Sequence, residues 1–184
     1  MNAENGKKKR ARLTTRDITM MGLMTAVIVV SKEILAFLPN IELVSFWMIL
    51  FTLYFGRKIL FVVPVFVVIE GFLYGINQWW IMYLYVWPIL VLAAYLGRKQ
   101  ESVLFWSVLS GTFGLMFGAL CTLTYVAFMI PEAGLIGGLR AGVFWWIAGL
   151  RMDIIHCVSN FLIMLFLYEP IRKVMKKIHF VVET

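Results

Sequence analysis

Residues 43–74 read LVSFWMILFTLYFGRKILFVVPVFVVIEGFLY, two apolar runs separated by the basic pair Arg57 and Lys58. The first run is shorter than the roughly 20 apolar residues that a helix needs to cross the hydrocarbon core of a bilayer, and the second is close to that limit. Short or proline-interrupted helices are tolerated in a membrane where neighbouring helices bury them or where they line a cavity. We therefore predict two short helices packed inside a larger bundle.

Apolar runs also fill the sequence on both sides of this stretch. Hydrophobic residues make up 62% of the 184 residues, charged residues 15%, and the mean hydropathy is +0.88. These values are far outside the range of a soluble domain of this size. We expect an all-α integral membrane protein with six transmembrane helices at residues 15–37, 43–56, 59–74, 79–97, 102–130 and 141–168. The expected domains are a basic cytoplasmic N-terminal tail (1–14), a six-helix membrane domain (15–178) and a short C-terminal tail (179–184).

The basic residues predict the orientation of this bundle. Fourteen of the 17 Lys and Arg residues fall where alternate connections would meet one membrane face. By the positive-inside rule, both termini are expected in the cytoplasm. The net charge of +7 then follows from topology and from contact with anionic lipid headgroups, so no nucleic-acid partner is needed. The longest connection, about residues 131–140, is Gly-rich and extracellular in this topology. The clusters are Lys7, Lys8, Lys9, Arg10, Arg12 and Arg16, then Arg57 and Lys58, then Arg98 and Lys99, then Arg172, Lys173, Lys176 and Lys177.

A polar stripe in the last helix is the first candidate for a functional site. Asp153, His156 and Asn160 recur at helical spacing, and Trp146 and Gly149 lie earlier on the same face. Polar side chains inside a membrane are costly, so we expect them to face the protein interior and to have a structural or functional role there. One interpretation is that the stripe lines a solute pocket. The alternative is that its members hydrogen-bond between helices and stabilise packing.

The fourth helix and the first turn add further candidates. Trp80, Tyr83 and Trp87 share a helix face, where they either line a pocket or form an aromatic belt at the membrane interface. Glu42 follows the first helix and either covers a pocket from outside or is a solvated loop charge.

Charged residues within the helices also need partners. For Glu70 the candidates are Lys32, Arg151 and Arg140, in a structural ion pair or beside a ligand contact. Asp153 has two candidate partners, Arg151 and Lys32.

The first helix carries Gly22 and Ala26, a small-xxx-small pair that lets another helix approach closely. Together with the chain length, the six helices, the internal termini and the short second helix after an outer turn, this segment resembles the substrate-binding S component of an energy-coupling factor (ECF) transporter. The family motif is AxxxA, and Gly22 departs from it while keeping the small size. The resemblance implies that Gly22 and Ala26 contact a transmembrane partner.

The resemblance further implies a division of labour between subunits. The S component captures a vitamin or related micronutrient near the outer face of the bacterial cell membrane, and a transmembrane coupling subunit with two cytoplasmic ATPases drives its delivery inward. This chain has no G-x-x-x-x-G-K-[ST] phosphate loop, so ATP and Mg would be bound by the partner ATPases, and no catalytic residue, cofactor or metal site is assigned here. The expected substrate-binding residues are Glu42, Trp80, Tyr83, Trp87, Trp146, Asp153, His156 and Asn160.

The cargo is assigned by exclusion. The second half of the chain does not resemble the thiamine, riboflavin, folate or biotin branches, so a cobalamin-like corrinoid is the cargo hypothesis. Two other function classes stay open from the sequence. One is a stand-alone facilitator or assembly factor, and the other is an intramembrane enzyme that uses Glu70, Asp153 and His156 as acid, base or metal ligands.

Overall fold

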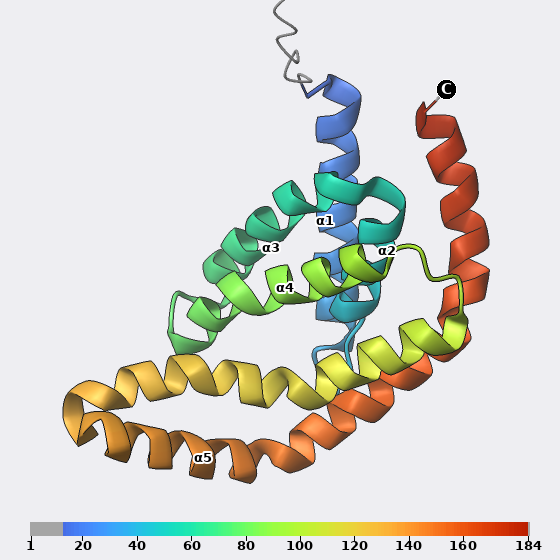
Figure 1. The fold of residues 1–184 in the computed structure, drawn as a ribbon. Coiled ribbons are helices and arrows are strands. Elements are labelled where there is room, and N and C mark those ends of the chain that lie inside the picture. The colour runs from blue at the N-terminus through green and yellow to red at the C-terminus, as the bar shows by residue number, and fades with distance from the viewer. Residues whose placement is uncertain (1–12, 184) are drawn as a thin grey trace, which may run out of the picture.

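A computed structural model describes residues 13–183, with side chains up to Ile178. Helices are the only regular secondary structure within the described residues (Figure 1). The elements are α1 (Thr15–Leu35), α2 (Val44–Phe55), the 3₁₀ turn η1 (Gly56–Lys58), α3 (Ile59–Tyr74), α4 (Gln78–Gly97) and α5 (Val103–Glu183). The predicted tail at residues 1–14 lies mostly outside the described residues, and the helical backbone of α5 continues through the segment predicted as a C-terminal tail.

Four apolar helical segments are long enough to cross a membrane: residues 15–35, 44–74, 78–97 and 103–178. The prediction of an all-helical chain with membrane-spanning character is therefore confirmed within the described residues. The count of six spans differs from the count of four segments because α2 and α3 follow each other through η1, and because α5 contains two arms.

The second helix is packed inside the bundle, as its short length predicts. Nine of the twelve residues of α2 are buried, Phe46, Ile49 and Leu50 almost completely. α2 packs against α1, α4 and α5, so most of its sides are covered. α3 buries one face, which includes Phe66 and Glu70, and exposes the other.

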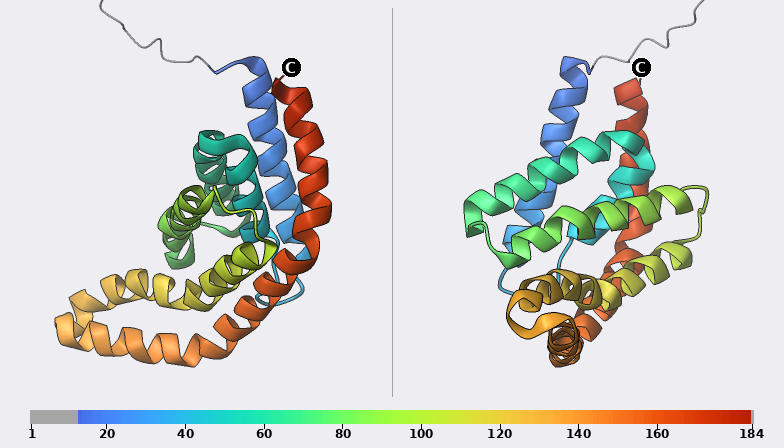
Figure 2. Two further views of the ribbon diagram at one scale, coloured as in Figure 1. Left: turned by 45° about the vertical axis from the view of Figure 1, so that its right-hand side comes forward. Right: turned by 60° about the vertical axis from the view of Figure 1, so that its left-hand side comes forward.

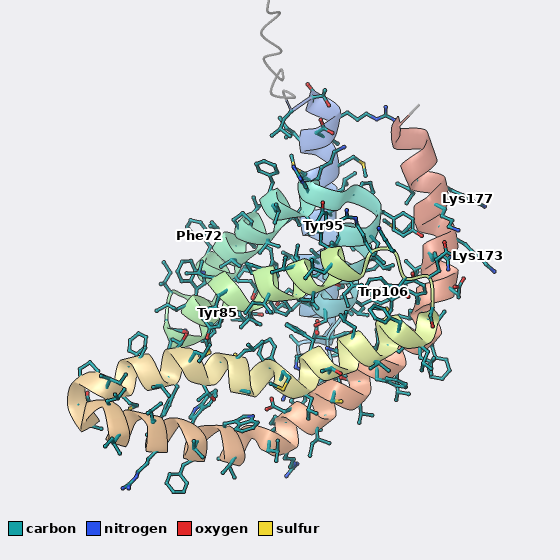
Figure 3. All side chains as sticks on the ribbon, viewed as in Figure 1. Phe72, Tyr85, Tyr95, Trp106, Lys173 and Lys177 are labelled. Atoms are coloured by element: carbon teal, nitrogen blue, oxygen red, sulfur yellow. The ribbon has the colours of Figure 1, made fainter. Side chains whose placement is uncertain are left out.

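The start of α1 is joined to η1 by polar contacts. Thr14 and Asp17 form a reciprocal capping box at the first turn of α1. Asp17 Oδ1 also lies 2.6 Å from Lys58 Nζ, which ties the α2–α3 connection to the first turn of α1. The C-terminal end of α5, where Lys173 and Lys177 project outward in Figure 3, lies on the same side of the molecule as the start of α1 (Figures 1 and 2).

The last element is a helical hairpin rather than two helices joined by a loop. α5 reverses direction at Gly134, whose φ of 69° and ψ of 173° are not helical. The two arms are residues 103–133 and 135–183. Figures 1 and 2 show the first arm side by side with the beginning of the second arm and running in the opposite direction, whereas the C-terminal part of the second arm (red) turns away and extends toward the end of the molecule where α1 begins. The prediction of a Gly-rich connection over residues 131–140 is therefore wrong except at Gly134. Gly138 is helical, and a Cβ there would lie 3.0 Å from a side-chain carbon of Ile130, so this glycine permits close helix packing instead of a loop.

Further glycines let the arms approach along the rest of the hairpin. A Cβ at Gly114 would lie 2.7 Å from the carbonyl oxygen of His156, and one at Gly111 would lie 3.2 Å from the carbonyl oxygen of Cys157. At Gly118 an added Cβ would overlap the carboxylate of Asp153. Small residues at this spacing fix which residues of the second arm face the first arm.

α4 is attached to the first arm through a tyrosine. The Tyr85 hydroxyl lies 2.9 Å from both the Leu120 carbonyl oxygen and the Thr124 hydroxyl. Since the carbonyl oxygen can only accept, the tyrosine donates to Leu120 and can accept from Thr124. This contact holds α4 against the hairpin and helps to enclose the space between them.

Candidate functional site

A cavity of about 340 Å³ lies between α1, the connection at residues 36–43, and the elements α3, α4 and α5. Its volume is at the lower end of the range of ligand pockets. It is at the opposite end of α1 from Arg16, because Lys32 in the last turn of α1 lines it. The lining residues are Lys32, Leu35, Ala36, Leu38, Pro39, Asn40, Ile41, Glu42, Val44, Tyr74, Tyr83, Trp87, Phe117 and His156.

The connection at residues 36–43 is held onto the second arm of α5. Asn40 adopts a positive φ of 58°, a conformation that asparagine tolerates better than most residues. Its carbonyl oxygen accepts a 3.0 Å hydrogen bond from the Ser159 hydroxyl. The turn is thereby fixed one helical turn away from His156.

Glu42 and His156 form a largely buried polar contact in the cavity wall. His156 Nε2 lies 3.1 Å from Glu42 Oε1, and the Ser45 backbone N–H donates to Glu42 Oε2 at 2.9 Å. Burial raises the pKa of the Glu42 carboxyl, but the hydrogen bonds from His156 and Ser45 outweigh burial and hold the pKa below its ordinary value. The His156 ring stands edge-on to Phe117, with ring centroids 5.0 Å apart. The glutamate in the loop and the histidine in the last helix are therefore one unit.

A second polar group lies on the other wall, around Lys32. Its ammonium nitrogen is 2.8 Å from Glu70 Oε2, 3.3 Å from Glu33 Oε1 and 4.3 Å from the centre of the Tyr74 ring. The Tyr74 hydroxyl donates a 2.5 Å hydrogen bond to Glu33. Of the three partners predicted for Glu70, the structure selects Lys32. The Glu70 side chain is fully buried, so this ion pair is inside the protein.

Tyr83 and Trp87 supply the aromatic wall between these two groups. Their rings meet edge to face at 5.3 Å, and Tyr83 also stacks on Phe66 at 6.1 Å. Trp87 is 2% exposed, and its indole N–H has no acceptor among the described side chains and backbone. Trp80, the third predicted member of this face, does not line the cavity, because its indole N–H donates to the Val67 carbonyl oxygen at 2.7 Å.

The polar stripe of the last helix divides between the cavity and the interior of the hairpin. His156 lines the cavity, whereas Asp153 accepts hydrogen bonds from the Gly118 backbone N–H at 3.0 Å and from Trp146 at 3.2 Å. Neither basic partner predicted for Asp153 contacts it among the described residues. Asn160 is 1% exposed, lies outside the cavity lining, and its Nδ2 has no partner within residues 13–178.

The structure thus brings together half of the predicted substrate-binding residues, namely Glu42, Tyr83, Trp87 and His156. Lys32 and Tyr74 were not predicted to line the site. The available signal for Lys32 was a charged residue at the end of the apolar run of α1. Tyr74 ends a helix and carries no comparable signal. Within the described residues, no three His, Cys, Asp or Glu side chains are placed to hold a metal ion.

The predicted partner-contact residues are outside the lining of this cavity. Gly22 and Ala26 are exposed on α1, and a Cβ added at Gly22 would meet no atom within 4 Å. The described part of the chain therefore leaves this face of α1 uncovered.

No protein-family model matches the chain, and comparisons with curated proteins and with solved structures give no significant match. The function proposed below rests on the sequence and on the geometry of the cavity.

Proposed function

We propose that this chain is the substrate-binding S component of an ECF-type importer in a bacterial cell membrane. In this proposal six segments span the membrane, both termini are cytoplasmic, and the cavity beside residues 36–43 opens to the outside. A transmembrane coupling subunit and two cytoplasmic ATPases are the partners, and this chain itself makes and breaks no bond.

The observation that carries the proposal is the composition of the cavity wall. A solute-binding site joins apolar walls to a few directed polar groups. Here the aromatic rings of Tyr83 and Trp87 stand between the Glu42–His156 pair and the ion pair of Lys32. Elements from both halves of the chain supply these groups, so a bound solute would contact α1, α4 and α5 together.

The uncovered face of α1 supports the second half of the proposal. A subunit that binds cargo and makes or breaks no bond needs a surface by which a partner senses the bound state. Gly22 and Ala26 offer a flat helix face with no side chain of the described chain against it. Small residues at this spacing permit close contact with a helix of another subunit.

A cobalamin-like corrinoid stays the cargo proposed from the sequence. The cavity volume is close to the lower limit for pockets that enclose drug-sized ligands. A corrinoid would therefore bind with residues 36–43 displaced from the second arm, which requires the Asn40–Ser159 and Glu42–His156 hydrogen bonds to open. A smaller vitamin would bind with these contacts intact.

Calorimetric titration of the purified protein with B-type vitamins and corrinoids tests the solute-binding role. We expect submicromolar binding of one compound, a loss of affinity of about 1–3 kcal/mol in His156→Ala, and a smaller effect in Asn160→Ala. His156 lines the cavity and Asn160 does not, so the pair is a matched comparison on one helix. A folded protein that binds no member of the panel would contradict the proposal.

Docking is tested by enlarging the face of α1. Gly22→Leu and Ala26→Leu should leave solute binding intact and weaken co-purification with the coupling subunit and the ATPases. Ala127→Leu, an equal enlargement at an exposed position of α5, is the control and should assemble normally. Transport by the purified chain alone would instead establish a facilitator, and turnover of a lipid or peptide substrate would establish an enzyme.

A further inference from the structure

The charges around the cavity are unequal. Within the described residues, its wall and the groups that directly contact that wall contain three carboxylates, Glu33, Glu42 and Glu70, and one permanent cation, Lys32. Glu70 is fully buried and pairs with Lys32 at 2.8 Å, so these two charges balance. Glu33 is 38% exposed, so solvent partly screens its charge. Glu42 is the carboxylate that has no permanent counter-ion.

Glu42 keeps room for a further partner. Its side chain is 16% exposed, and one hydrogen bond reaches each oxygen, from Ser45 and from His156. An ionised carboxylate offers about four lone-pair sites, so two stay free. A carboxylate in a low-dielectric site gains most from a positively charged donor.

Lys32 is poorly placed to receive an anion. Two carboxylates and the face of the Tyr74 ring already surround its ammonium group. A ligand carboxylate or phosphate would have to compete with Glu33 and Glu70 for this ammonium group, and displacement of the fully buried Glu70 would leave a charge unpaired inside the protein. The same contact shows that an aromatic face of this cavity accepts a cation, since Lys32 Nζ lies 4.3 Å from the Tyr74 ring centre.

We propose that the cavity selects a compact organic cation that carries a ring, with its charged nitrogen on Glu42 and its ring among Tyr83, Trp87 and Phe117. The unpartnered N–H of Trp87 adds a preference for a hydrogen-bond acceptor on that ring. The substrate class named here rests on the solute-binding function proposed above. It differs from the corrinoid hypothesis in both size and charge.

The test uses three probes that share a phenyl ring and a three-carbon chain: 3-phenylpropylamine, 3-phenylpropanol and 3-phenylpropanoate. Binding to the full chain in lipid nanodiscs is measured by saturation-transfer NMR and calorimetry. We expect the amine to bind roughly tenfold more tightly than the alcohol, and the carboxylate to bind most weakly. In Glu42→Gln the preference for the amine over the alcohol should disappear.

Two comparisons separate this binding from partition into lipid. Partition is the same for the wild type and for Glu42→Gln, so it cancels in their difference. Glu101→Gln removes a carboxylate outside the cavity and should keep the full preference for the amine. Tightest binding of the carboxylate, equal binding of all three probes, absence of binding, or an unchanged preference in Glu42→Gln would each overturn the inference.

The outcomes also distinguish this inference from the proposed function. If a neutral or anionic vitamin binds tightly and loses affinity in His156→Ala, the solute-binding function stands and the charge selection fails. If the amine is preferred through Glu42 but no vitamin binds, the charge selection stands and the vitamin carrier role fails.

Discussion

Replacing Gly114 with alanine tests how closely the two arms of α5 must approach. A Cβ at this position would lie 2.7 Å from the carbonyl oxygen of His156 and 2.9 Å from the backbone nitrogen of Cys157. Non-bonded heavy atoms are most stable at about 3.5 Å or more, so the two backbones would have to separate by roughly 0.8 Å. Both contacted atoms belong to a helical backbone, which cannot move aside as a flexible side chain can.

Two opposing effects determine the change in unfolding free energy that Gly114→Ala causes. Inserting a methyl group into a tightly packed site costs about 1–3 kcal/mol, whereas exchanging glycine for alanine inside a helix contributes up to about 1 kcal/mol of stability. Gly149→Ala makes the same exchange in the second arm at a position where an added Cβ meets no atom within 4 Å. The difference in unfolding free energy between Gly114→Ala and Gly149→Ala therefore measures the cost of close packing alone, and we expect about 1–3 kcal/mol.

The assay is reversible unfolding in mixed micelles, with helix content followed by circular dichroism for the wild type and both variants. We expect Gly114→Ala to be less stable than the wild type and Gly149→Ala to be as stable or slightly more stable. Equal stability of the two variants would refute the reasoning, because it would mean that the arms are not held at backbone contact beside His156.

Three further predictions use the same assay. Lys32→Met should lower the unfolding free energy by on the order of 3 kcal/mol, because it leaves the buried Glu70 without its counter-ion. The double variant with Glu70→Leu should recover most of that loss, and an equal loss in the single and double variants would contradict the ion pair. The pKa of Glu42 lies below its ordinary value of 4.5 in the folded protein, so ionised Glu42 contributes stability that is fully present above that value and is lost as pH falls through the folded pKa. The stability advantage of the wild type over Glu42→Gln should therefore shrink as pH falls below 4.5. Trp146→Phe removes a donor to Asp153 and should cost about 1 kcal/mol of stability without changing solute affinity, and a selective loss of affinity would disprove this.

Hydropathy and length predicted most of the helices. The second apolar run was too short to face lipid on all sides, and α2 is buried on most of its surface, so the length argument identified a packing position. Composition, in contrast, gave a wrong prediction at residues 131–140. A cluster of glycines is typical of a loop in a soluble protein, but between membrane helices it also permits close contact, as at Gly138. Composition does not separate these two uses, and only Gly134 breaks the helix within the described residues.

Only part of the site could be predicted, because helical periodicity shows which residues share a helix face but not which elements pack against that face. Asp153 and His156 lie one turn apart on the same side of the last helix, yet they have different partners. Asp153 accepts a hydrogen bond from Gly118, whereas His156 contacts Glu42. The partner of each depends on where the first arm and residues 36–43 pass. Lys32 illustrates the reverse case: its pairing with Glu70 was among the alternatives from charge alone, but its place in the cavity wall needed the arrangement of α1 against α3.

The contacts of residues 36–43 also determine when the cavity forms during biosynthesis. Glu42 and His156 are 114 residues apart in the chain, and Asn40 and Ser159 are 119 apart. At typical translation rates, on the order of ten seconds pass between synthesis of the loop and synthesis of its anchors. During that interval α2, α3, α4 and the first arm of α5 are made, while the loop still lacks His156 and Ser159. A chain truncated before His156 would enter the membrane without a closed site. Synthesis of the last helix is thus the step that completes the wall of the cavity.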